Sequence, residues 1–130
     1  MSNYRLYGDA KATATQVDHG RKQKALQSAQ QRFEQSPTPA NQATLASALF
    51  DIGRYDEAEK LLKELIAGHG EDVHVLFELG FIYKNLGRNE EAVKTWLKLV
   101  EIDPKHSLTR AAENESWMID REYKPSWLRK

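Results

Sequence analysis

A four-residue pattern occurs three times along the chain and limits the folds that are open to it. The pattern, Asx followed by any residue, Gly and Arg, is found at residues 18–21, 51–54 and 85–88. Successive copies are 33 and 34 residues apart, and an alanine follows each glycine by five residues. Self-similarity with a period of this length is typical of stacked repeats, in which each unit packs against its neighbours. The sequence therefore predicts a solenoid, a fold that offers surfaces to partners and seldom carries a catalytic centre.

The clearest unit covers residues 73–106. Apolar residues recur in it at helical spacing, and Gly87 is expected to end a first helix in the left-handed conformation that glycine favours. A second apolar stripe follows until Asp103 and Pro104, which stop the second helix. Gly80 lies inside the first helix at a cost of about 1 kcal/mol relative to alanine. Its position predicts the close approach of another backbone.

Residues 39–72 repeat this plan. Thr38 is a candidate cap, Pro39 a candidate first helical residue, and Gly53 the break between two helices. Residues 6–38 are a degenerate copy, in which Gly20 is expected to form the turn. Its first helix is weak because Ala10, Ala14 and Val17 give only a thin apolar stripe. Terminal repeats are often atypical in this way.

One further helix is expected after Pro104. Residues 107–122 have an apolar face but no partner helix after them, so they are predicted to cap the stack. The tail, residues 123–130, contains Trp127 and Leu128. The whole chain, residues 1–130, is interpreted as a single domain.

The unit 73–106 resembles a tetratricopeptide repeat over its whole length. Leu76 stands where the family pattern has Trp, Trp96 replaces Phe and Leu99 replaces Ala; five residues match the pattern: Leu79, Gly80, Tyr83, Ala92 and Pro104. The resemblance implies an all-α fold, a right-handed superhelical stack of antiparallel helix pairs with a C-terminal capping helix. It also implies that the motif residues form the core and that the first helices line a concave, peptide-binding groove.

Mapping the groove positions of the family onto this chain gives the candidate site. The residues are Phe50, Asp51, His74, Phe77, Phe81, Lys84 and Asn85. Three phenylalanines on a face that normally meets solvent would form an apolar patch of the kind that marks binding. Ala40, Ala43 and Ser47 on the opposite side would leave room for an inserted helix or side chain. The alternative is that the capping helix or a neighbouring repeat covers these rings.

Three readings of function remain open from the sequence. The leading one is a non-catalytic protein-interaction module, a scaffold or adaptor that holds a peptide or helix of a partner protein in its groove. The second is a homo-oligomeric assembly protein whose tail places Trp127 and Leu128 in its own groove or that of another copy. The third is a secretion-type chaperone.

Other functions lack a matching pattern. The charges balance at 19 basic and 19 acidic residues, which predicts no nucleic-acid partner. The chain has no cysteine, and its four histidines lack the spacing of a helical metal pair, so no metal or cofactor is expected. No catalytic constellation is present, which argues against an enzyme. Without a signal-peptide pattern or an apolar run that spans a membrane, a cytoplasmic location is expected.

Overall fold

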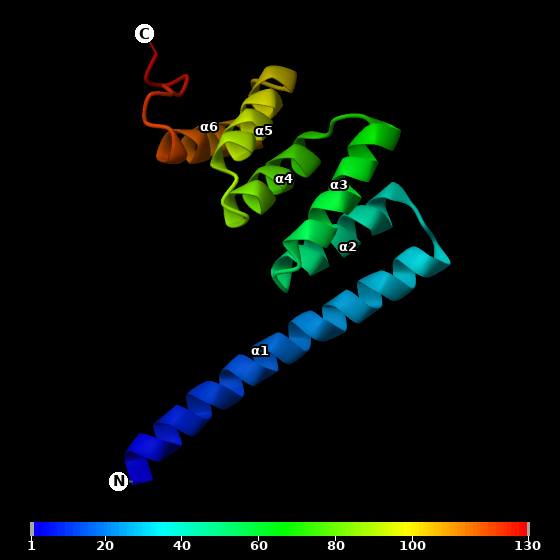
Figure 1. The fold of residues 1–130 in the computed structure, drawn as a ribbon, viewed down its shortest axis with the longest axis vertical. Helices are drawn as coiled ribbons and strands as arrows, with labels where there is room; N and C mark the ends of the chain where they lie inside the picture. The colour runs from blue at the N-terminus through cyan, green and yellow to red at the C-terminus, as the bar shows by residue number, and fades with distance from the viewer. Residues whose placement is uncertain (1, 130) are drawn as a thin grey trace.

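The computed structural model describes the backbone of residues 2–129 and the side chains of residues 17–129. Helices are the only regular elements of this backbone, so the predicted all-α class is confirmed (Figure 1). No described helix is both long and apolar enough to cross a bilayer. The six helices are α1 (Ser2–Gln35), α2 (Pro39–Asp51), α3 (Tyr55–His69), α4 (Val73–Asn85), α5 (Asn89–Ile102) and α6 (Ser107–Ile119).

Two helical hairpins, α2–α3 and α4–α5, form the centre of the molecule. Each turns at a glycine with positive φ, which is 86° at Gly53 and 77° at Gly87. Glycine reaches this conformation without steric cost, and it directs the chain back along the first helix. Thr38 caps α2 as expected, because its hydroxyl accepts a hydrogen bond from the backbone N–H of Asn41. The paired helices agree with the predicted repeat architecture.

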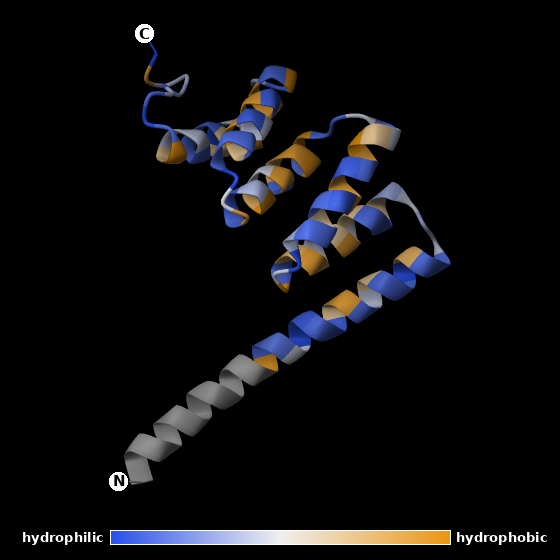
Figure 2. Cartoon of the chain, in the orientation of Figure 1, coloured by the Kyte–Doolittle hydropathy of each residue, from blue (hydrophilic) through white to orange (hydrophobic). Residues whose placement is uncertain are grey.

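Trp96 is the centre of the α4–α5 hairpin. It is fully buried, and its indole occupies the place where a side chain at residue 80 would project. Gly80 is therefore required for close packing, but the neighbour that approaches it is the side chain of Trp96 and not the backbone that the sequence predicted. Figure 2 shows that much of the α4 ribbon carries the colour of hydrophobic residues. The motif residues Leu76, Leu79, Tyr83, Ala92 and Leu99 are all buried.

Charged side chains link the two hairpins at the second turn. Arg88 donates two hydrogen bonds to Glu91, 2.7 and 2.6 Å long, and its Nη1 lies 3.0 Å from Oε1 of Glu59 on α3. Lys63 also pairs with Glu59, at 2.8 Å. Burial raises the pKa of Glu59, but the hydrogen bonds and the charges of Lys63 and Arg88 outweigh burial and hold the pKa below its ordinary value. Glu59 is thus an ionised bridge between hairpins.

The first copy of the pattern does not form a hairpin. The helix α1 runs without a break through Gly20, which is not among the glycines with positive φ. Ala25 is exposed, whereas its counterparts Ala58 and Ala92 are fully buried. The turn expected at Gly20 is therefore wrong. Ala10 and Ala14 lie outside the residues whose side chains are described.

The absence of this hairpin has a physical reason in the sequence. Val17 is 50% exposed, and the stripe to which it belongs offers little apolar area to bury against a second helix. A continuous helix keeps its backbone hydrogen bonds without that burial, and one glycine costs it only about 1 kcal/mol. The α1 helix instead packs against α2 as a single element, through Leu26, Ala29 and Phe33.

The helix α6 packs on α5 and closes the stack, which confirms the predicted capping helix. The residues after it fold over α6. Pro125 is buried, and the backbone N–H of Ser126 donates to the buried carboxylate of Glu113. The tail is thus part of the folded unit rather than a free extension.

Candidate functional site

The candidate site lies on the first helices of the two hairpins, α2 and α4, and is called here the first-helix face. The seven predicted groove residues define it: Phe50, Asp51, His74, Phe77, Phe81, Lys84 and Asn85. All seven lie on α2 or α4. The three phenylalanines are half-buried and pack against the core, so part of each ring remains accessible.

Two of these rings belong to a continuous aromatic series. Phe77 and Phe81 meet edge to face with their centres 5.0 Å apart, and Phe81 meets Trp96 in the same manner at 5.1 Å. The indole N–H of Trp96 donates to the backbone carbonyl of Phe77, 3.1 Å away. Edge-to-face contacts of this kind hold rings in fixed orientations. The rings on α4 are therefore supported from beneath by the core.

Phe50 lies apart from this series. Its described aromatic contact is with Tyr55 of α3, at 5.4 Å between ring centres. The three phenylalanines thus share a face but form two separate aromatic groups rather than the single patch that the sequence predicted.

A carboxylate that the mapping of groove positions left out lies on the same face. Glu78 of α4 is half-buried, and both of its oxygens accept from the hydroxyl of Ser47 on α2, at 2.8 and 3.0 Å. Burial raises the pKa of Glu78 above its ordinary value, the Ser47 hydrogen bond opposes this rise, and the charge of Asp51 adds to it. Its one sequence signal is a single charge inside the apolar run of α4.

The remaining predicted residues make contacts within the chain. Lys84 pairs with Glu115 of α6, 3.2 Å away. The side-chain amide of Asn85 donates to the backbone carbonyl of Phe81. His74 meets His106 edge to face, with ring centres 5.3 Å apart. Lys84 therefore contacts α6, and His74 contacts the residue that caps the start of α6.

A cleft of about 290 Å³ opens where α2 begins, between the end of α3 and the start of α4. Ala40 and Ala43 line it, together with Leu65 and Val75. These two alanines are the small residues that were expected to leave room on α2. The space at this position comes from their short side chains.

The tail does not occupy the groove of its own chain, which was one of the two placements expected for it. Trp127 lies against α6, where the Arg110 guanidinium carbon is 5.0 Å from the ring centre. The backbone N–H groups of Leu128 and Arg129 bond to the carbonyl of Pro125, so the tail turns rather than extends. Leu128 is 47% exposed. The placement of Trp127 in the Phe50, Phe77 and Phe81 groove of its own chain is therefore wrong, because Arg110 and Glu113 hold the tail on α6.

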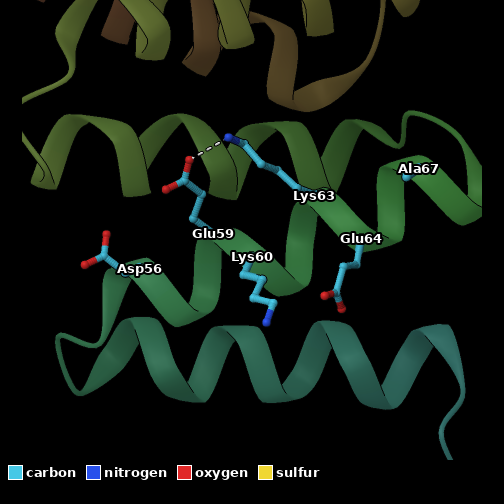
Figure 3. Close-up of a pocket in the computed structure, with 6 residues that line it drawn as sticks. All are labelled: Asp56, Glu59, Lys60, Lys63, Glu64 and Ala67. Carbon is cyan, nitrogen blue, oxygen red and sulfur yellow. Dashed lines mark ion pairs between the residues drawn. The ribbon is translucent and has the colours of Figure 1, made fainter.

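A second hollow lies over the outer side of α3 and has a different character. Its volume is about 410 Å³, and five of the six side chains labelled in Figure 3 are charged: Asp56, Glu59, Lys60, Lys63 and Glu64. Glu59 is already paired with Lys63 and Arg88. Because Glu59 and Lys63 already form ion pairs within the chain, they are less available to a ligand. This hollow is therefore the weaker candidate for a binding site.

The hairpins and their motif residues correspond to a known family. The family model of the tetratricopeptide repeat matches residues 49–113, which is half of the chain. The chain therefore belongs to the tetratricopeptide repeat family. A comparison with curated proteins found no match. Tetratricopeptide repeats generally mediate protein–protein interaction.

Proposed function

We propose that this protein is a non-catalytic interaction module that binds a peptide or helix of a partner protein on its first-helix face. The observation that carries the proposal is the pair of half-buried rings on α4, Phe77 and Phe81, held edge to face above Trp96. Apolar rings that are fixed in position and partly accessible lose little conformational entropy when a partner covers them. They are therefore suited to act as anchors for an apolar side chain.

The cleft beside Ala40 and Ala43 supports the same proposal. Its lining is largely apolar and includes Ala40 and Ala43 of α2 and Val75 of α4. An apolar side chain of the partner that enters a cleft of this size is removed from water on most of its surface. The rings and the cleft together give a bound segment two points of attachment, one on each first helix.

The test is affinity capture from the source cells, followed by mass spectrometry, with the wild-type chain and two variants. Phe77→Ala removes an accessible ring, while Trp117→Ala removes a half-buried ring of α6 outside the face. Partners of the face are expected to be lost with Phe77→Ala and kept with Trp117→Ala. Circular dichroism verifies that both variants remain helical. Retention of every specific partner by Phe77→Ala would contradict the proposal.

A further inference from the structure

Two acidic residues are adjacent in sequence to phenylalanines of the first-helix face. Asp51 follows Phe50 at the end of α2, and Glu78 lies between Phe77 and Leu79 on α4. Ser47 of α2 bridges the helices through its hydrogen bonds to Glu78. Ser47 and Asp51 are one helical turn apart on α2, so both carboxylates lie where α2 and α4 approach each other.

No described side chain neutralises these two carboxylates. Among residues 17–129, the ion pairs include neither Asp51 nor Glu78. The basic residue of the face, Lys84, is already paired with Glu115 of α6. The apolar surface of the face thus has an excess of negative charge at the junction of α2 and α4.

Because Glu78 is half-buried, its ionisation depends strongly on whether a positive charge lies beside it. Burial and the charge of Asp51 both raise the pKa of Glu78, which means that its ionised form is disfavoured as the protein stands. A positive charge placed beside it would reverse that effect. Charge complementarity on an otherwise apolar surface selects among partners more than it adds affinity.

Resting on the proposed function, we propose that the bound segment carries a lysine or arginine next to its apolar anchor, and that this cation lies between α2 and α4 against Asp51 and Glu78. The anchor covers the rings of Phe77 and Phe81, while the cation supplies the charge that the face lacks. Segments with an acidic residue at that position are repelled. The face therefore distinguishes basic amphipathic segments from other apolar ones.

Selection from a displayed library of random 12-residue peptides tests this inference without knowledge of the natural partner. Three proteins are used as bait: wild type, Phe77→Ala, and the double variant Asp51→Asn, Glu78→Gln. Glutamine at residue 78 keeps the volume and an acceptor for Ser47. Peptides selected by wild type are expected to combine an aromatic or aliphatic residue with a neighbouring lysine or arginine. The double variant is expected to select apolar residues without that basic enrichment.

The outcomes separate the inference from the proposed function. Apolar peptides with no basic enrichment, lost with Phe77→Ala, would overturn the inference and leave the proposed function in place. A failure of wild type to select any peptide that depends on Phe77 would overturn both.

Affinity measurements with one selected peptide complete the test. Glu78→Gln is expected to weaken binding about tenfold, as measured by fluorescence anisotropy, whereas Glu64→Gln, on the exposed side of α3, leaves it unchanged. When the cationic residue of the peptide is replaced by citrulline, the wild type and Glu78→Gln should bind equally. An equal effect of Glu78→Gln on both peptides would contradict direct pairing.

Discussion

The indole of Trp96 fills the space beside Gly80, where the Cβ of any other residue would collide with it. Gly80→Ala is therefore expected to lower the free energy of unfolding by about 1–3 kcal/mol, the usual cost of overpacking a core. This loss should appear although alanine is the better helix former by about 1 kcal/mol. Urea denaturation measures it.

The matched control for that change is Gly68→Ala in the last turns of α3. A Cβ at residue 68 would meet nothing within 4 Å, and the backbone there has no positive φ. The variant should be as stable as wild type, or more stable by up to about 1 kcal/mol. Equal losses in both variants would show that Trp96 does not set the requirement at residue 80.

The continuity of α1 predicts a contrast between two glycines of the same sequence pattern. Gly20→Ala should increase helicity and stability by up to about 1 kcal/mol, because Gly20 is within a helix and has open space around its Cα. Gly53→Ala should cost about 1–2 kcal/mol, since its φ of 86° is unfavourable for alanine. Circular dichroism at 222 nm with thermal melting measures both. Similar destabilisation by the two changes would mean that Gly20 forms a turn.

The bridge between hairpins predicts a specific sensitivity to acid. The folded-state pKa of Glu59 lies below its ordinary value of 4.5, so its ionised form contributes stability at higher pH. This contribution is lost as the pH falls from about 4.5 through the lowered value. Glu59→Gln should lower stability at neutral pH by about 1–2 kcal/mol and reduce the loss on acidification.

Chemical denaturation at a series of pH values measures this effect. Glu57→Gln is the control, because the pair of Glu57 with Arg54 is solvent-exposed and worth about 1 kcal/mol or less. An unchanged pH profile for Glu59→Gln would show that the bridge to Arg88 is not formed in solution.

The seating of the tail on α6 predicts that its removal destabilises the protein. Deletion of residues 123–130 exposes the site of Pro125 and takes the Ser126 donor from the buried carboxylate of Glu113. A loss of about 1–3 kcal/mol is expected, which is the cost of leaving such a group unsatisfied. Thermal denaturation measures it. Trp127→Ala, which removes the contact with Arg110 but keeps Pro125 and Ser126 in place, should cost less than the deletion, and an unaltered melt of the truncated chain would refute the packing.

The hairpins could be predicted from the sequence because their determinants are local. Gly53, Gly87 and the cap at Thr38 act within a few residues, and the motif spacing places Trp96 against Gly80. The same local signal failed at Gly20, because a glycine permits a turn but does not require one. Whether the chain reverses there depends on the apolar area that the reversed segment could bury.

The site was less predictable than the fold for a related reason. The positions of Phe77 and Phe81 followed from the repeat, but their support by Trp96 depends on the packing between α4 and α5. Glu78 was missed because its importance comes from Ser47 on another helix. The angle between α2 and α4 determines that contact, and no spacing within one helix reveals it.

The uneven distribution of charged bridges along the stack has a consequence for how the molecule comes apart. Arg88 connects the two hairpins through its ion pair with Glu59, whereas Arg54 pairs with Glu57 of its own hairpin. Among residues 17–129, no ion pair joins α1 to either hairpin. Nearest-neighbour coupling governs the order in which solenoids melt. The two hairpins should therefore melt as one cooperative block, with α1 detaching first, so that amide protons in α1 exchange fastest.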